Sequence, residues 1–232
     1  MRQPAGRSAR RSGGERKPRE ERWAELIQVA TEVFYEKGYD GASLQDIADR
    51  LGMLKGSLYY YIQSKEDLLF DVISSVHKDG LAVIQARAGV PGDALQRLEN
   101  VIVGHVEHTC GNLVSTAVFL HELAALPEHR RLEILGSEHA YQGVFRELVE
   151  AGQRDGLVRS ELNPRLAVLG LLGSANWVYR WFRPGGELPA EEIGAELADM
   201  VIRGIATDEA LQARARRDQS PRAGQSKFGP LQ

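Results

Sequence analysis

The apolar positions near the N-terminus recur with the spacing of a helix. An amphipathic helix is predicted over residues 24–37, because five apolar side chains fall on one face: Leu26, Ile27, Ala30, Val33 and Phe34. Gly38 stands where such a helix ends. A second helix follows, with Ser43 as its N-cap, Asp46 as the capping-box partner and a stripe of Leu44, Ile47, Ala48 and Leu51. Gly52 supplies the tight turn after it.

A third, short helix is predicted from about Lys55 to Tyr61. A helix of this length is not stable alone, so Leu58 and Ile62 must pack against the first two helices. That packing leaves the outer face of the third helix free. Such an arrangement is typical of a helix–turn–helix, in which the exposed helix enters the major groove of DNA.

Helical spacing continues through the remainder of the chain. Ser64 is followed three residues later by Asp67 and opens a helix whose apolar face is Leu68, Leu69, Val72, Ile73, Val76 and His77. Further helices are predicted at residues 93–110, 113–125, 128–155, 164–182 and 189–206, with Pro or Gly at the breaks. No stretch alternates with period two, so the predicted class is all-α, with about nine helices.

These patterns divide the chain into four parts. We expect a basic, disordered arm at residues 1–22, a helix–turn–helix domain at 23–70, a larger helical domain at 71–207 and a polar, disordered tail at 208–232. The arm either follows DNA phosphates and the minor groove or is a solvated tail.

Composition and charge narrow the class of protein. The 232 residues are 43% hydrophobic, enough for a sizeable core, but no apolar run approaches the ~20 residues of a membrane span. The lone Cys110 excludes an intrachain disulfide, and the cytoplasm is the expected compartment. The net charge is −3, yet residues 1–22 hold eight Arg or Lys against three Glu, a local charge of +5 beside the helix–turn–helix.

The residues of the helix–turn–helix carry a family resemblance. The runs Ser43-Leu-Gln-Asp-Ile-Ala-Asp-Arg-Leu-Gly52 and Gly56-Ser-Leu-Tyr-Tyr-Tyr-Ile-Gln-Ser-Lys-Glu-Asp-Leu68 resemble the DNA-binding domain of TetR-family transcriptional regulators. The match covers roughly a fifth of the chain. It departs at Ile62, where the family usually has Phe, although Ile also fills an apolar position.

The resemblance implies a homodimer that binds double-stranded operator DNA. It also implies that the larger domain binds a ligand and forms the dimer. Residues expected at base edges or the nearby backbone are Lys55, Gly56, Ser57 and Tyr60. Residues expected at phosphates are Ser43, Tyr59, Tyr61 and Lys65. For Tyr61, packing inside the domain is an equal alternative. Dimerisation is expected through residues 164–182 and 189–206, packed with their symmetry mates as a four-helix bundle.

A second resemblance lies near the C-terminus. The segment Asn176-Trp-Val-Tyr-Arg-Trp-Phe-Arg-Pro-Gly-Gly186 is similar to the penultimate helix and following loop of TetR-family repressors of fatty-acid, aromatic-acid and steroid degradation, which commonly sense acyl-CoA thioesters. An acyl-CoA effector is therefore expected, bound by Phe119, Leu123, Tyr141, Phe145, Trp177 and Trp181, with Arg180 and Arg183 near its phosphates. The tryptophans serve equally well in the core or a dimer interface, and the arginines in ion pairs with Glu.

The sequence lacks the motifs of several other classes of protein. No Gly-rich phosphate loop, nucleophile elbow or metal motif occurs, so the expected protein is not an enzyme, has no catalytic residues and needs no cofactor. His105, His108 and Cys110 lack standard zinc spacing, so no metal is expected. The remaining alternative is a TetR-like regulator of a drug or another amphipathic molecule. In either case, effector binding is expected to tilt the helix from Lys65 to about Ala86 and release the operator.

Overall fold

The computed structural model describes residues 18–219, and helices dominate this part of the chain. Eleven α-helices and one 3-10 helix are present among the described residues, together with one isolated antiparallel bridge between Val158 and Ala206. The predicted all-α class is confirmed. None of the helices within residues 18–219 combines the length and apolar character needed to cross a membrane.

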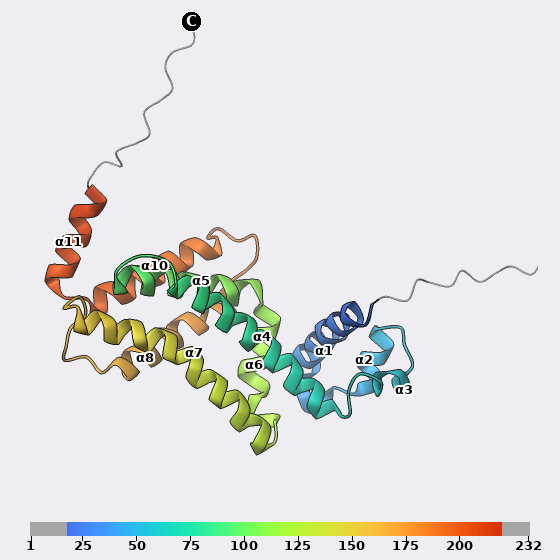
Figure 1. The fold of residues 1–232 in the computed structure, drawn as a ribbon. Coiled ribbons are helices and arrows are strands. Elements are labelled where there is room, and N and C mark those ends of the chain that lie inside the picture. The colour runs from blue at the N-terminus through green and yellow to red at the C-terminus, as the bar shows by residue number, and fades with distance from the viewer. Residues whose placement is uncertain (1–17, 220–232) are drawn as a thin grey trace, which may run out of the picture.

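The helix–turn–helix lies at one end of the molecule (Figure 1). It consists of α1 (Arg19–Gly41), α2 (Leu44–Arg50) and α3 (Lys55–Leu58). One hydrophobic cluster joins these helices to the start of α4 (Lys65–Ala88), and its fully enclosed members include Ala30, Phe34, Ile47, Ala48, Leu58, Leu68, Leu69 and Ile73. The predicted apolar stripes therefore do face one core.

The first helix is longer than predicted at both ends. It begins at Arg19, because two glutamates in its first turn suit the positive end of the helix dipole and Arg22 pairs with Glu25 at 2.6 Å. Residues 19–22, assigned to the arm, thus belong to a helix, and residues 1–17 of that predicted arm lie outside the described part. Gly38 does interrupt the helix, with a φ of +70° that favours glycine, before a last turn that ends at Gly41.

Helix α4 connects the two ends of the molecule (Figure 1). Ser64 is its N-cap, and the Ser64 hydroxyl accepts a hydrogen bond from the Asp67 backbone N–H at 3.0 Å. The 24 residues give a length of about 36 Å. The helix contacts α1 at one end and α5, α6 and α7 farther along.

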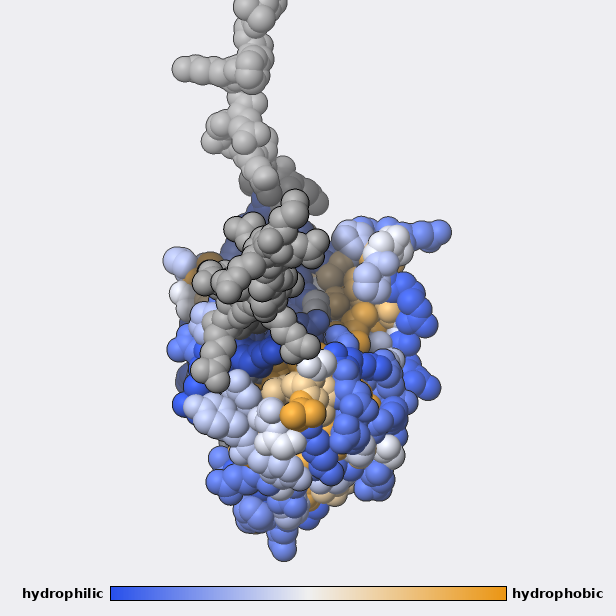
Figure 2. Space-filling model, turned by 90° about the vertical axis from the view of Figure 1, so that its right-hand side faces the viewer, coloured by the Kyte–Doolittle hydropathy of each residue, from blue (hydrophilic) through white to orange (hydrophobic). Residues whose placement is uncertain are grey.

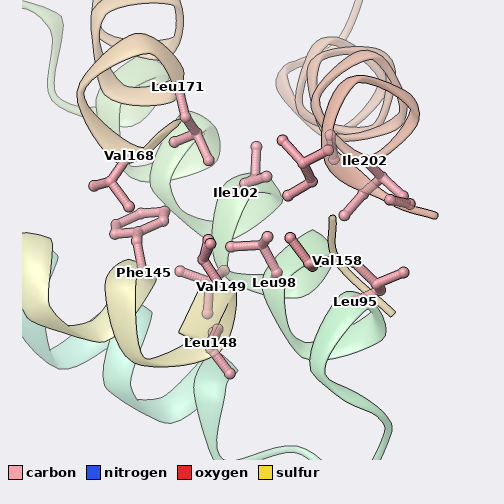
Figure 3. Close-up of a cluster of buried hydrophobic side chains, with 14 of the residues drawn as sticks. Leu95, Leu98, Ile102, Phe145, Leu148, Val149, Val158, Val168, Leu171 and Ile202 are labelled. Atoms are coloured by element: carbon pink, nitrogen blue, oxygen red, sulfur yellow. The ribbon is translucent and has the colours of Figure 1, made fainter. Parts of the chain in front are cut away.

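The larger helical unit is built around α5 (Ala94–Gly111), which packs against α4, α7, α8 and α10. The other elements are α6 (Leu113–Glu122), η1 (Leu123–Ala125), α7 (Glu128–Arg154), α8 (Pro164–Asn176), α9 (Val178–Trp181) and α10 (Ala190–Ile205). Figure 3 shows the side chains from α5, α7, α8 and α10 that fill the space between them, among them Leu98, Ile102, Phe145, Val168 and Ile202.

One predicted helix is divided in the structure. Residues 164–182 form α8 and the short α9, with the break at Trp177. Val178 is 1% exposed after this break and joins a small cluster with Val106, Cys110 and other apolar residues. Burial of Val178 against α5 is the tertiary contact that holds α9 in its own position.

The prediction of a disordered tail is wrong for its first half. Residues 208–219 form helix α11 (Asp208–Gln219), while residues 220–232 lie outside the described part. Arg214 pairs with Glu99 at 2.6 Å, and Arg217 pairs with Asp93 at 3.0 Å, so two arginines tie this polar helix to α5. Ala210 is buried in the main hydrophobic cluster.

Candidate DNA interface and effector cavity

The start of α3 is open to solvent and anchored from behind. Leu58 is fully buried and Ile62 nearly so, whereas Lys55, Gly56 and Ser57 are exposed. The helix is shorter than predicted, and a hydrogen-bonded turn from the Leu58 carbonyl to the Tyr61 N–H, at 2.8 Å, continues the chain. A four-residue helix makes few hydrogen bonds of its own, so burial of Leu58 holds it in place.

The exposed aromatic rings follow directly after α3. Tyr59 is 52% exposed and Tyr60 is 72% exposed, which leaves both hydroxyls accessible to a ligand. Tyr61 is half-buried, packs on the domain core and makes an edge-on contact with the ring of Tyr60. Figure 2 shows this end of the molecule, where a mainly hydrophilic surface surrounds a small hydrophobic area.

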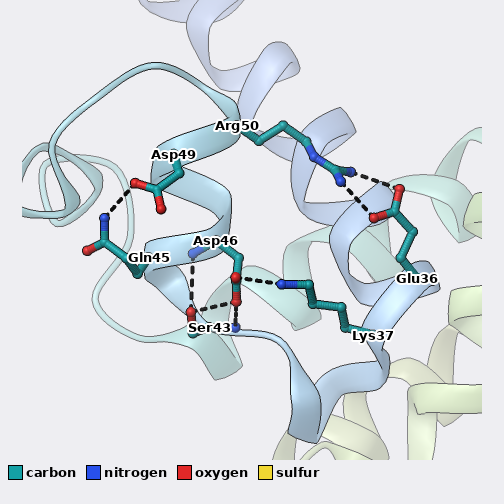
Figure 4. A network of polar contacts seen from close by, with 7 residues as sticks. All are labelled: Glu36, Lys37, Ser43, Gln45, Asp46, Asp49 and Arg50. Carbon is teal, nitrogen blue, oxygen red and sulfur yellow. Dashed lines mark hydrogen bonds and ion pairs between the residues drawn. The ribbon is translucent and has the colours of Figure 1, made fainter.

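A polar network fixes α2 against α1 (Figure 4). Arg50 donates two hydrogen bonds to the carboxylate of Glu36, at 3.0 and 2.7 Å. Lys37 Nζ lies 2.5 Å from an oxygen of Asp46, and this contact with the capping box holds the pKa of Asp46 far below its usual range. These groups are solvent-exposed, so the network orients the two helices more than it stabilises them.

The other predicted DNA contacts lie beside this network. Ser43 forms the predicted capping box with Asp46, because its hydroxyl accepts from the Asp46 N–H at 3.1 Å and the Asp46 carboxylate accepts from the Ser43 N–H at 2.8 Å. Lys65 Nζ lies 4.2 Å from the ring centroid of Tyr39. The structure thus places Ser43 at the N-cap of α2, where its hydroxyl also donates to the Asp46 carboxylate at 2.6 Å, and Lys65 at the first residue of α4.

The larger unit encloses a cavity between α4, α5, α6, α7 and α8. The space open to the centre of a water molecule is about 70 Å³, room for a few waters or a small chemical group. Its lining comprises Val76, His77, Gly80, His105, His108, Thr109, Thr116, Phe119, Glu138, Tyr141, Gln142, Leu172 and Asn176. Glu138 is the one residue of this lining with a formal charge, and no Lys or Arg is among them.

Three histidines surround the cavity, all packed against neighbouring groups. His105 Nδ1 lies 2.7 Å from the hydroxyl of Tyr141. Burial is the main reason that the pKa of His105 falls to about 4, and burial also lowers the pKa of His77 and raises that of Tyr141. His108 Nε2 lies 3.2 Å from the carbonyl of Val76. His77 and His105 are therefore neutral at pH 7, and Tyr141 keeps its proton.

The predicted effector residues occupy four different places. Phe119 and Tyr141 line the cavity, and Phe145 is buried just behind it, with its ring centroid 6.0 Å from that of His105. Leu123 packs instead on the hydrophobic cluster of the helix–turn–helix. Four residues lie exposed outside the cavity lining: Trp177, Arg180, Trp181 and Arg183.

Sequence reasoning missed the polar half of the cavity. His105 and His108 stand three apart on α5, and Tyr141 and Phe145 four apart on α7, so each pair shares a helix face. The spacing of His105 and His108 in the sequence is not that of a standard zinc site, and it does not predict that they line a cavity. Among residues 18–219, no group of three or more His, Cys, Asp or Glu side chains is placed to hold a metal ion.

An exposed short helix joined by α4 to a larger helical unit is the arrangement expected of a DNA-binding regulator. Residues 26–72 match the model of the tetR family of bacterial regulatory proteins, and residues 91–205 match the tetracyclin repressor-like C-terminal domain. The chain belongs to the TetR family, a family of transcriptional regulators and not of enzymes.

Comparison with individual proteins agrees with this assignment. The transcriptional repressor KstR2 of Rhodococcus jostii is 27% identical over 187 residues, which cover 80% of this chain and 92% of that protein. A TetR/AcrR-family regulator of Thermobifida fusca is 35% identical, with a TM-score of 0.63 over 79% of this chain and 98% of that one. AibR, solved with isovaleryl coenzyme A and operator DNA, is 27% identical, with a TM-score of 0.67 over 77% and 97%.

The buried histidine gives a prediction for stability. Because the pKa of His105 is about 4 in the fold and near 6.5 in an unfolded chain, the unfolded chain binds more protons between these pH values. The contribution of His105 to the free energy of unfolding is therefore fully present above pH 6.5. It is lost as the pH falls towards 4, by up to about 1.4 kcal/mol for each pH unit. Urea unfolding at fixed protein concentration across this range measures the slope.

Two variants test whether His105 causes this pH dependence of the free energy of unfolding: His105→Gln, and His139→Gln as its control. Residue 139 is exposed on α7, so its replacement should leave the slope unchanged, while His105→Gln should flatten it. Equal slopes in wild type and His105→Gln contradict the assignment of a neutral, buried imidazole.

Proposed function

We propose that this protein is a homodimeric repressor that leaves its operator when a small molecule enters the cavity. The observation that carries the proposal is the continuity of α4, whose first turns pack under α3 and whose middle, at Val76, His77 and Gly80, lines the cavity. In this proposal the helix–turn–helix domain begins at Arg19, the larger domain extends through α11, and the protein acts on DNA in the cytoplasm.

The exposed start of α3 supports the proposed DNA contacts. Lys55, Gly56, Ser57 and Tyr60 would meet base edges or the adjacent backbone. A Cβ on Gly56 would meet nothing within 4 Å inside the protein, so the fold does not require glycine there and close approach of DNA gives it a purpose. Ser43, Tyr59, Tyr61 and Lys65 would bind phosphates, with Tyr61 the weakest of these because it is half-buried.

The proposed dimer uses the surface formed by α8 and α10. This surface exposes Leu166 at 66%, Leu169 at 44% and Met200 at 55%. Gly170 and Gly173 of α8 have open space where a Cβ would stand, which permits another helix to approach closely. Exposed apolar side chains beside small residues suit a two-fold helical interface.

An acyl-CoA thioester is the proposed effector. The lining of the cavity is mostly uncharged and includes Phe119, Tyr141 and Leu172, which suits an acyl group. The phosphates would remain outside, where Arg180 and Arg183 are exposed, and Asn176 of the lining stands four residues before Arg180. AibR, which was solved with isovaleryl coenzyme A and operator DNA, supports this class of ligand.

The proposed mechanism follows from the size of the cavity. A space of about 70 Å³ is smaller than most drug-sized ligand sites, so an effector would have to separate α4 from α7 and α8. The α4–α7 contact includes Arg130, which pairs with Asp67 at 3.0 Å in the first turn of α4. Movement of α7 would therefore reach the helix–turn–helix directly and change the separation of the two recognition helices.

A cationic, drug-like effector is the second candidate. The observation in its favour is Glu138, the one charged residue of the cavity lining, which also accepts a hydrogen bond from Gln142 at 3.3 Å. A buried cation would pair with this carboxylate.

Removal of one phosphate donor tests the proposed DNA interface. Lys65→Ala and Tyr59→Phe should weaken binding to operator and to random DNA by similar factors, and Lys65→Ala should reduce the slope of log affinity against log salt by about 0.9. Fluorescence anisotropy at several salt concentrations measures both quantities. Lys78→Ala, an exposed lysine farther along α4, is the control and should leave the slope unchanged. A loss confined to the operator would reassign these residues to base recognition.

The dimer is tested by a charge on the exposed face of α8. Leu169→Arg should yield a monomer at micromolar concentration, because an arginine in an apolar interface leaves a buried, unpaired charge. Leu132→Arg on α7, at a position 59% exposed, is the control and should leave the dimer intact. Light scattering distinguishes the two states, and a monomeric wild-type protein at the same concentration would refute the dimer.

The effector is tested by titration of the protein–operator complex. Acyl-CoAs, including isovaleryl coenzyme A, should lower operator affinity roughly 5- to 150-fold, and operator DNA should weaken acyl-CoA binding by the same factor. Free acids and cationic drugs are the comparison ligands. If acyl-CoAs leave operator affinity unchanged while a cationic drug releases the DNA, the second candidate replaces the first.

A further inference from the structure

One polar atom in the wall of the cavity has no hydrogen-bond partner. His105 is 5% exposed and lines the cavity, and its Nε2 is buried and unpaired among the described residues. Buried polar groups in folded proteins are almost always hydrogen-bonded, so an unpaired one beside a ligand cavity indicates a partner that arrives with the ligand.

We infer that the end of the effector that enters this cavity carries an uncharged carbonyl oxygen, which accepts a hydrogen bond from the Nε2–H of His105. The inference rests on the proposed function, because it assigns ligand chemistry to the same cavity. It adds the recognised group and the residue that selects it. The residues predicted from the sequence for this site include neither His105 nor any other histidine.

The hydroxyl of Tyr141 determines which nitrogen of His105 carries the proton. Tyr141 is 9% exposed, and His105 Nδ1, at 2.7 Å, is the one hydrogen-bond partner recorded for its hydroxyl. If the hydroxyl donates its proton to Nδ1, the neutral imidazole must carry its own hydrogen on Nε2. The reverse arrangement would leave the buried Tyr141 proton without an acceptor. His105 therefore presents a donor to the cavity.

The neighbouring side chains do not satisfy that donor. Both nitrogens of His108 are occupied, Nε2 by the Val76 carbonyl and Nδ1 by the Asn112 amide at 3.4 Å. His77 Nδ1 lies 3.1 Å from the hydroxyl of Ser137. The side chain of Asn176 lies close enough to the ring to act as a hydrogen-bond acceptor, which raises the pKa of His105 against the larger, lowering effect of burial. Its geometry falls short of a hydrogen bond, and Nε2 keeps no partner among residues 18–219.

The charges around the cavity favour a carbonyl over a carboxylate. A carboxylate would enter a lining that holds Glu138 and no Lys or Arg, beside two histidines that burial keeps neutral. An unpaired buried charge is far more costly than a buried carbonyl with one hydrogen bond. Two sources offer the same group, the carbonyl of an acyl thioester and a ketone on a hydrocarbon skeleton.

The first experiment needs no effector. Nitrogen-15 NMR of the full-length, histidine-labelled wild-type protein reports which ring nitrogen is protonated, and contacts with the Tyr141 ring assign the His105 signals. We expect a neutral His105 with hydrogen on Nε2 at pH 7. A hydrogen on Nδ1, or a charged ring, would overturn the inference whatever the natural effector is.

The second experiment uses four small probes with the same branched carbon chain. They are 4-methyl-2-pentanone, S-methyl 3-methylbutanethioate, isovalerate and 2-methylpentane, each added at millimolar concentration. The ketone and the thioester should shift the His105 Nε2–H signal and bind more tightly than isovalerate. A preference for the thioester over the ketone, or the reverse, identifies the source of the carbonyl. Tighter binding of isovalerate, or no shift with either carbonyl probe, would refute the role of His105.

Two variants separate the hydrogen bond from the shape of the cavity. His105→Phe should reduce affinity for the carbonyl probes roughly 2- to 12-fold and leave 2-methylpentane unaffected. His105→Gln keeps an N–H donor and should retain most of the preference, and His139→Gln on the exposed face of α7 is the control. If acyl-CoAs do not release the operator but the protein still prefers the carbonyl probes, the proposed acyl-CoA effector is refuted and the inference about His105 stands.

Discussion

Helix α4 buries side chains in both of the large hydrophobic cores of this protein, and the link between the recognition helix and the cavity depends on that constraint. The first turns of α4 bury Leu68, Leu69 and Ile73 beneath the recognition helix, and its last half buries Ile84 in the core of the larger unit. Between them, a Cβ on Gly80 would lie 3.0 Å from His108 and 3.3 Å from Tyr141. A side chain at this position would require His108 or Tyr141 to shift by a few tenths of an ångström, so glycine suits the close passage of α4 past α5 and α7, and this contact is one wall of the cavity.

The recognition helix and the cavity are therefore mechanically linked without a hinge between them. Helix α3 has four residues and depends on Leu58, which is buried among side chains of α1, α2 and α4. Any displacement of α4 at His77 or Gly80 is carried along an unbroken helix to its first turn, where Arg130 of α7 is also bound to Asp67. The small cavity lies against the middle of this helix, so a group bound there would contact α4 directly.

The helix–turn–helix could be predicted from the sequence more completely than the cavity of the larger unit. The capping box of Ser43 and Asp46, the N-cap at Ser64 and the buried stripe of Leu58 and Ile62 depend on residues close together in the sequence, and the structure confirms them. The cavity is formed by five different helices. The predicted effector residues are divided between its lining, the core behind it, the cluster of the helix–turn–helix and the solvent-exposed α9 region. Spacing on one helix does not tell which neighbouring helix its face will meet.

The sequence by itself determined the helical class, most helix limits and the family, because periodicity, caps and short motifs are local properties of the chain. Only the tertiary structure decided that residues 208–219 are helical, since ion pairs of Arg214 and Arg217 with α5 hold a segment whose composition favours disorder. It also decided that His105 lies against a cavity with an unpaired nitrogen. Burial and pairing depend on long-range packing, which no local pattern in the sequence encodes.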